Sequence, residues 1–272
     1  MSDISIQPVT QMAFDDAMQD KYFEGIAAEL QNVAPGRRTK RSTSILETAS
    51  SDSSAQGVGT SVVGPSLVVF EQALSEDDRQ AALECQQFAE AVVRKRLPQG
   101  ASNEERYRMY NEALLSLGWV TQSYTYKKYV SKQLTITMNE AILQVLETVV
   151  SGGASSVLNL VASGFSKLKG DKDALKIVDA GSKKNDVVSF KAVPCITTAD
   201  GGMSMLMGGL DLVDKEYNGN FLFVTYKTQG VQIFQGAGVR NFNRRAFERK
   251  KNTIYEYNDQ FADGLFKQLT GQ

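Results

Sequence analysis

Residues 185–241 read NDVVSFKAVPCITTADGGMSMLMGGLDLVDKEYNGNFLFVTYKTQGVQIFQGAGVRN, and this stretch decides the fold. Apolar, β-rich segments alternate in it with short turns such as Asn218-Gly219. Turns of this kind join neighbouring strands into hairpins, which makes the strands antiparallel. The stretch therefore predicts an antiparallel β-meander with strands at residues 187–198, 203–213, 221–226 and 231–239. The pair Gly208-Gly209 predicts a bulge, or a place where another group approaches the backbone closely.

A long amphipathic helix at residues 243–269 is predicted to close the meander. Its apolar side chains recur at helical spacing and should cover one face of the sheet. They include Phe247, Ile254, Phe261 and Leu265.

The first turns of the same helix are strongly basic. The cations are Arg244, Arg245, Arg249, Lys250 and Lys251. They form either a solvated helix face or a patch that contacts anionic lipid or nucleic acid. Cations are disfavoured near a helix N-terminus, and this adds some weight to the second interpretation.

The N-terminal half is predicted to be helical, apart from a mobile loop at residues 35–64 that is rich in Ser, Thr, Ala and Gly. One helix is expected at residues 10–33. Ser75 and Ser102 each precede an acidic first turn, as is typical of helix N-termini. Residues 119–126 have the composition of a β-strand.

Tyrosine and lysine side chains crowd together after residue 123. They are Tyr124, Tyr126, Tyr129, Lys127, Lys128 and Lys132. The pattern suits a strand edge with cross-strand aromatic pairs, and it also resembles the belt of a membrane interface.

Two apolar segments, residues 141–150 and 154–168, follow a capping box that begins at Thr137. Each is too short to span a bilayer upright. They form a buried helical hairpin, a hairpin that inserts into membranes, or the wall of an apolar ligand tunnel. The fold class that results is α+β. N-terminal helices and this hairpin pack on a C-terminal antiparallel meander in a single domain, residues 1–272.

Composition excludes several kinds of chemistry. The 272 residues carry a formal net charge of −1, which argues against a dedicated nucleic-acid binder. There is no histidine, so Ser-His-Asp catalysis, Cys-His catalysis and histidine metal ligation are excluded. The Gly236-Ala237-Gly238 run lacks the third glycine and the βαβ context of a dinucleotide site, and we expect neither a nucleotide nor a metal.

The two cysteines differ in context. Cys85 lies on a helix among apolar residues and is predicted to be a core side chain. Cys195 follows Pro194, which suggests an edge strand or a bulge. Cys195 is therefore either a core thiol or a reactive, lipid-carrying one. Without histidine its activation is weak, and it suits one slow acyl transfer onto sulfur better than repeated turnover.

A lone tryptophan, Trp119, and the strand-borne Val193-Pro194-Cys195-Ile196 give the chain a plan that resembles the Evf-like (Erwinia virulence factor) family. Those are proteins of insect-associated plant-pathogenic bacteria. The resemblance implies a complex α/β fold, a palmitoyl chain bound as a thioester to Cys195, and association with anionic membranes. It also implies a role in virulence or persistence in an insect gut.

The leading hypothesis is thus a virulence factor that is S-acylated at Cys195 and bound to anionic lipid through the basic residues of the last helix. Its partners would be anionic lipids and a fatty acyl donor. One alternative is a cysteine-dependent acyltransferase or thioesterase-like enzyme, and another is a membrane-disrupting toxin that uses the 141–168 hairpin. The N-terminus lacks the features of a Sec signal peptide. We therefore expect synthesis in the cytoplasm and release by a non-classical route to host membranes.

Overall fold

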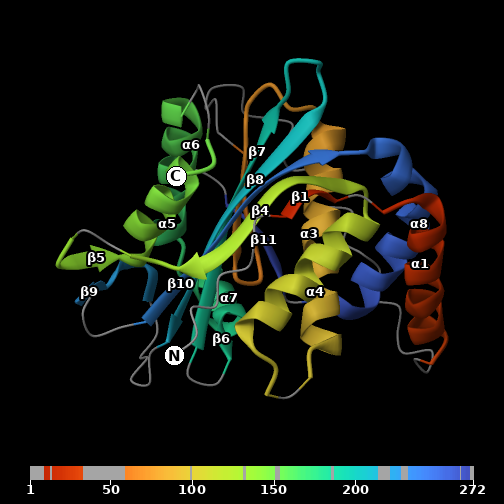
Figure 1. The fold of residues 1–272 in the computed structure, drawn as a ribbon, viewed down its shortest axis with the longest axis horizontal. Helices are drawn as coiled ribbons and strands as arrows, with labels where there is room; N and C mark the ends of the chain where they lie inside the picture. Colours follow the sequence, from red (N-terminus) through yellow and green to blue (C-terminus); the bar gives the residue numbers. More distant parts are fainter. Residues whose placement is uncertain are drawn as a thin grey trace.

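Helices cover both faces of one large, mixed β-sheet in a computed structural model of the chain (Figure 1). The structure describes residues 9–12, 14–32, 59–98, 100–130, 133–150, 154–184, 187–213, 221–227, 232–263 and 265–269. The predicted α+β class is confirmed. Three of the four apolar segments in residues 185–241 form the middle of the sheet, because their side chains can be buried on both faces.

The main sheet has the strand order β1-β4-β10-β8-β7-β3-β2-β11, with β6 paired to β7. Its strands are β1 (Val9–Met12), β2 (Gly59–Val63), β3 (Ser66–Phe70), β4 (Trp119–Lys128), β6 (Lys183–Lys184), β7 (Val187–Thr197), β8 (Met203–Val213), β10 (Gln232–Phe242) and β11 (Phe266–Gln268). Neighbours are antiparallel except for β3 and β7, which run parallel. Strands that lie far apart in the sequence therefore meet at the centre of the sheet.

Three of the four strands predicted for the meander are present, and they are β7, β8 and β10. The strand predicted at residues 221–226 is wrong. β7, β8 and β10 are antiparallel neighbours, and β10 pairs directly with β8. Residues 221–226 do not lie between them. Phe221–Phe223 forms a 3-10 turn, η1, and β9 (Thr225–Lys227) pairs with β5 (Thr135–Thr137) in a separate sheet. Phe221 and Leu222 are both buried in the same apolar cluster, which a strand with alternating side chains does not allow.

One helical layer consists of α3 (Glu76–Arg96) and α4 (Asn103–Ser116), with α1 (Asp16–Gln31) and α8 (Arg244–Phe261) beside them (Figure 1). The opposite layer consists of α5 (Met138–Glu147), α6 (Ala154–Gly170) and α7 (Lys172–Ser182). The capping boxes at Ser102 and Thr137 are present, as predicted. The apolar hairpin of residues 141–168 is therefore the packed pair α5–α6.

Several predicted boundaries are wrong. The last helix ends at Phe261, and the chain then forms β11, because Phe266–Gln268 completes the ladder beside β2. The first helix begins at Asp16, since residues 9–12 pair with β4 instead. The loop predicted at 35–64 is wrong for residues 59–63, because these form β2. Its residues 35–58 lie outside the described part of the chain.

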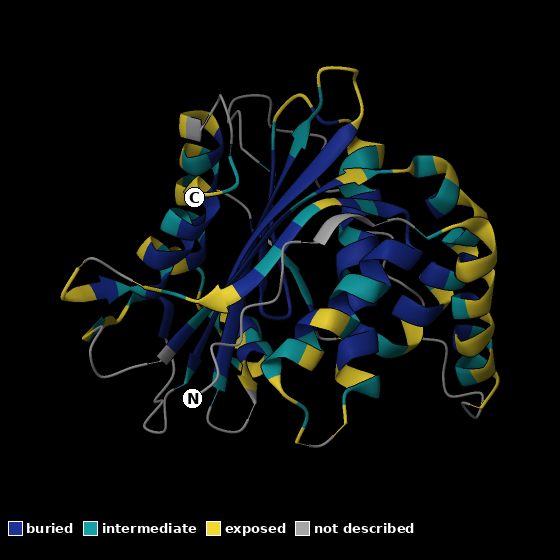
Figure 2. Ribbon diagram, viewed as in Figure 1, coloured by how far each residue is buried: buried dark blue, intermediate teal, exposed yellow. Residues whose placement is uncertain are grey.

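The sheet separates two apolar cores, and its middle strands are buried along most of their length (Figure 2). The core under α3 and α4 includes Cys195, and the core under α5 and α6 includes Leu206 and Leu210. The predicted close approach at the glycine pair is confirmed. A Cβ on Gly208 would lie 2.6 Å from Leu146 Cγ of α5, and one on Gly209 would overlap the Tyr107 hydroxyl of α4.

Candidate functional site

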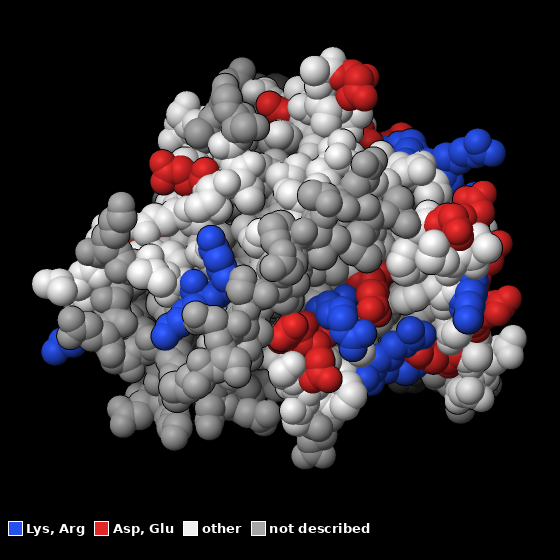
Figure 3. All heavy atoms as spheres, in the orientation of Figure 1, with Lys and Arg blue, Asp and Glu red and all other residues white. Residues whose placement is uncertain are grey.

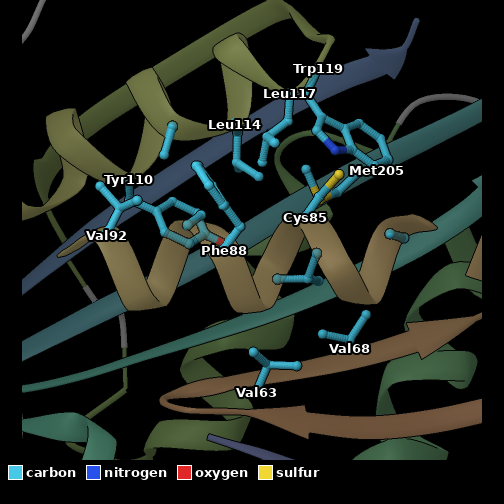
Figure 4. Close-up of a cluster of buried hydrophobic side chains, with 14 of the residues drawn as sticks. Val63, Val68, Cys85, Phe88, Val92, Tyr110, Leu114, Leu117, Trp119 and Met205 are labelled. Carbon is cyan, nitrogen blue, oxygen red and sulfur yellow. The ribbon is translucent and has the colours of Figure 1, made fainter. Parts of the chain in front are cut away.

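Cys195 lies on a central strand and faces α3. Its side chain is fully buried in the same apolar core as Cys85, Trp119 and Met205. Figure 4 shows how the last three side chains meet where α3 crosses the sheet. The edge-strand prediction for Pro194 is wrong, because β7 has β3 on one side and β8 on the other. The pairing of β7 with β8 is interrupted between Ala192 and Cys195, which accommodates a residue without an N–H group.

The environment of Cys195 disfavours the reactive form of its sulfur. Burial raises the pKa of the Cys195 thiol, so the group stays protonated at neutral pH. A thiol of this kind is a poor nucleophile, because the thiolate is the attacking species. Protein interiors are close-packed, so an acyl chain on Cys195 would have to lie among the side chains that now surround it. Burial raises the pKa of the Cys85 thiol in the same way.

A buried ion pair lies on the same face of β7 as Cys195, four residues earlier in the strand. Lys191 Nζ is 2.7 Å from Glu90 Oε1 of α3, and both side chains are less than a tenth exposed. The Ser66 hydroxyl donates a second hydrogen bond to that carboxylate, at 3.0 Å. Lys191 Nζ also lies 4.3 Å from the centre of the Tyr110 ring of α4. This pair was not predicted from the sequence, although Lys191 is in phase with Val193 and Cys195 along the strand.

A second cluster of buried polar side chains lies between α4 and strands β4, β10 and β8. The Tyr126 hydroxyl donates to Asp211 Oδ2 at 2.7 Å, and Arg240 donates to Asn111 of α4. Burial raises the pKa of the Asp211 carboxyl, and it lowers the pKa of the Arg240 guanidinium. The Tyr107 ring packs 5.2 Å from that of Tyr126. The bond between Arg240 and Asn111 therefore helps to hold α4 on the sheet. Asp211 could have been recognised because it shares a strand face with Met207.

Four of the five basic residues predicted to contact lipid have acidic partners within the protein, and the fifth, Arg245, is exposed. Arg244 pairs with Asp78, and Arg249 lies 2.5 Å from Asp16. Lys250 lies 2.6 Å from Asp20, and Lys251 lies 3.5 Å from Glu248. Blue and red spheres accordingly mix over α1 and α8 in Figure 3. A lipid contact through this helix stays a prediction, and an anionic surface would compete there with the protein's own carboxylates.

A small arm projects from the body beside α5 (Figure 1). We define it as the β5–β9 pair with the described residues next to it, 127–130, 133–134 and 224. Val130 is 82% exposed, Leu134 is 76% exposed and Val224 is 46% exposed. Lys127, Lys128 and Lys227 are exposed as well, and residues 127–137 and 221–231 contain no Asp or Glu.

The base of the arm is fixed to the body. Ile136 is buried, and the Tyr129 hydroxyl donates to Gln144 Oε1 of α5 at 2.6 Å. Tyr124 and Tyr126, which the sequence placed in the same aromatic group, are instead buried under α4 on a strand flanked by β1 and β10. The arm is therefore an exposed apolar and basic tip on an anchored base.

Other sites considered from the sequence are placed as follows. Gly236 and Gly238 lie buried inside β10, between β4 and β8. In the part of the chain that the structure describes, no three Asp, Glu or Cys side chains come together as a metal site would require. Nor does any helix there have the length and apolar character needed to cross a bilayer.

No family model matches the chain, and no curated protein matches it. Solved structures do. The chain is similar to the Evf virulence factor, with a TM-score of 0.38 and 13% identity over 89% of each chain. It is also similar to the activated Cyt2Ba monomer from Bacillus thuringiensis subsp. israelensis, with a TM-score of 0.38 and 14% identity over 65% of this chain and 97% of that one. A delta-endotoxin matches with a TM-score of 0.36 and 13% identity, over 64% of this chain and 80% of that one. The resemblance to the Evf virulence factor expected from the sequence is confirmed as a weak likeness.

Proposed function

We propose that the protein is a virulence or toxin-type factor that acts at anionic host membranes, and that the arm makes the first contact. The observation that carries this proposal is the combination of exposed aliphatic side chains on the arm with exposed lysines on β9 and at the end of β4, where the arm begins. Val130 and Leu134 supply apolar area for the headgroup region, and Lys127 and Lys128 supply positive charge beside them. Such a pairing suits an interface that is apolar inside and anionic outside.

The charge of the arm distinguishes it from α8. Each basic residue near an anionic surface contributes about 1 kcal/mol to binding. On α8 that contribution is reduced by carboxylates such as Asp16 and Asp20, which already neutralise the cations. The arm has no acidic residue in its sequence, so no carboxylate of its own offsets the attraction of its lysines for the membrane.

Vesicle binding tests the proposal. Removal of both charges in Lys127→Gln/Lys128→Gln should weaken binding to vesicles that contain phosphatidylserine by about 2 kcal/mol, or roughly 30-fold. Val130→Ser/Leu134→Ser should weaken it as well, and this loss should persist at high salt because it is apolar. Co-sedimentation with vesicles measures both losses, and release of an entrapped dye in the same samples separates binding from disruption.

The matched control is Arg245→Gln, which removes an exposed cation from α8 and leaves the arm unchanged. It should bind vesicles like the unmodified protein. If Arg245→Gln weakens binding and the arm variants do not, α8 is the contact surface and the proposal for the arm is wrong.

A fatty acyl thioester on Cys195 is the covalent part of the proposal. In forming it, the Cys195 sulfur would attack the carbonyl carbon of an acyl thioester donor, and the donor's thiol would leave with the proton. The buried, protonated thiol supports a single acylation while the core is open better than repeated enzymatic turnover.

Intact-protein mass spectrometry before and after hydroxylamine tests this part. An added acyl mass that hydroxylamine removes should be absent from Cys195→Ser. It should be present in Cys85→Ser, the matched control, which removes the other buried cysteine. An acyl mass that survives in Cys195→Ser, or the bare polypeptide mass from a host that supplies the donor, would exclude the thioester on Cys195.

A further inference from the structure

A cleft of about 220 Å³ opens on the side of the molecule where α3 and α7 end and α4 begins. The turn between β2 and β3 forms one wall of it, and the end of α7 packs directly against that turn. A Cβ on Gly181 would lie 2.8 Å from the Gly64 carbonyl carbon and 2.8 Å from Pro65 N. The glycine at this position of α7 is therefore what lets the two walls come together.

Three cationic side chains lie among the mostly apolar residues that line the cleft. Arg94 comes from α3, Arg106 from α4 and Lys183 from β6. Glu90 is the one acidic residue among the described residues that line it, and its carboxylate already accepts from Lys191 at 2.7 Å and from Ser66 at 3.0 Å. Lys191 thus neutralises the Glu90 carboxylate, and the net charge of the residues that line the cleft is positive.

Arg106 provides an independent observation. The Nε atom of Arg106 is buried, and this atom has no hydrogen-bond partner in the described part of the chain. Buried donors are almost always paired, because an unpaired one loses its bonds to water without compensation. An oxyanion in the cleft would supply the missing acceptor, and a guanidinium matches the oxygen spacing of a phosphate well.

We propose that this cleft binds a phosphate-type oxyanion through Arg106, with Arg94 and Lys183 completing the charge around it. The site is separate from the arm and does not depend on the membrane proposal. Two sources share this chemistry, a soluble phosphate compound and the headgroup of a phospholipid.

The test is a titration with inorganic phosphate. Isothermal calorimetry measures binding, and the urea midpoint of unfolding measures stability. Sodium chloride of equal ionic strength is the reference for both. The unmodified protein should bind and gain stability to a saturating level. Arg106→Gln should bind at least about tenfold more weakly, since a hydrogen bond to a charged group is lost. The matched control is Arg108→Gln, on the same helix, where the arginine is exposed and paired with Glu112.

The general salting effect of phosphate is common to all variants, so only the difference between them counts. Equal titrations for Arg106→Gln, Arg108→Gln and the unmodified protein would overturn the proposal. Should Arg106→Gln unfold in phosphate-free buffer, Lys183→Gln replaces it, and an unchanged affinity in that variant overturns the proposal equally.

Two further ligands distinguish the sources. Glycerol 3-phosphate in solution tests the soluble source, and vesicles of phosphatidic acid test the headgroup. Vesicle binding that falls in Arg106→Gln and not in Arg108→Gln assigns the site to lipid. Binding of the soluble ligands with vesicle binding unaffected by Arg106→Gln assigns it to a soluble phosphate. The arm variants should leave the phosphate titration unchanged, so failure of either proposal is recognised separately.

Discussion

Asp211 is a carboxylic acid in a place that disfavours its charge. It is fully buried under α4, and burial raises its pKa above the ordinary value of 3.8, although Tyr126 and Ser189 hydrogen bonds oppose the shift. Lys191 and Arg106 also face it and lower the pKa in part. The folded protein therefore holds this proton more tightly than the unfolded chain does.

The consequence is a defined dependence of stability on pH. A group whose pKa is raised on folding stabilises the protein fully below its unfolded pKa, and the contribution is lost as pH rises through the folded pKa. In Asp211→Asn the free energy of unfolding should fall less steeply as pH rises from about 4 than in the unmodified protein. Urea unfolding at a series of pH values measures the slope.

Asp200→Asn is the control for that experiment. Asp200 lies on the exposed turn after β7, and a hydrogen bond from Thr198 lowers its pKa. Its titration therefore ends below the range in question, and the slope above pH 5 should be unchanged. Identical slopes for Asp211→Asn and the unmodified protein would show that the buried carboxyl does not titrate in this range.

At the scale of elements, α6 approaches β3 closely at one glycine. A Cβ on Gly164 would lie 2.5 Å from Val69 Cγ1, inside the core under α5 and α6. Gly164→Ala should therefore cost about 1–3 kcal/mol of unfolding free energy, as overpacking does. Gly170→Ala, in the same helix with nothing within 4 Å of the new Cβ, should be neutral or gain up to about 1 kcal/mol.

Chemical denaturation of the two variants side by side measures this difference. Because helix propensity favours alanine in both, a loss confined to Gly164→Ala isolates the contact with β3. Equal stabilisation of the two variants would mean that α6 does not lie against the sheet in this way.

Elements with strong local signals were predictable from the sequence. The capping boxes at Ser102 and Thr137 fix helix starts within a few residues, and β-rich, mainly apolar segments between turn residues indicated β7 and β8. The β2–β3 hairpin was missed because its turn, Gly64-Pro65, follows a segment with the composition of a loop. β11 was missed because Leu265 and Phe266 continue the helical spacing of α8.

The buried charges were the least predictable part of the candidate site. Lys191 and Glu90 are far apart in the sequence, and only the parallel pairing of β3 with β7 and the position of α3 bring them to 2.7 Å. Strand periodicity alone places Lys191 on the core face and gives no partner for it. Likewise, Arg94, Arg106 and Lys183 meet only because three separate elements end at the same cleft.

For the molecule as a whole, two cores on one sheet predict a single cooperative unit. Trp119 is the only tryptophan and is fully buried in the core under α3 and α4. In a single-domain protein, its fluorescence and the far-ultraviolet circular dichroism should change at the same denaturant concentration. Moving the tryptophan with Trp119→Phe/Phe223→Trp places the probe on the other core, where Phe223 packs at the edge.

Coincidence of the two signals in both proteins is expected. Fluorescence that changes before the dichroism in one protein only would show that one helical layer leaves the sheet separately, and the prediction of one domain would then be wrong.

The parallel contact between β3 and β7 also affects how the chain is made. β3 at residues 66–70 can pair with β7 only after residues 187–197 have been synthesised. In the same way, β4 pairs with the later strand β10, and β2 pairs with β11 at residues 266–268. Long-range pairing of this kind slows folding and leaves apolar strands exposed meanwhile. All five residues of β3 are buried in the finished sheet, so the growing chain on the ribosome presents them uncovered. The β2–β3 hairpin is therefore the segment of the nascent chain that chaperones should bind until translation reaches β11.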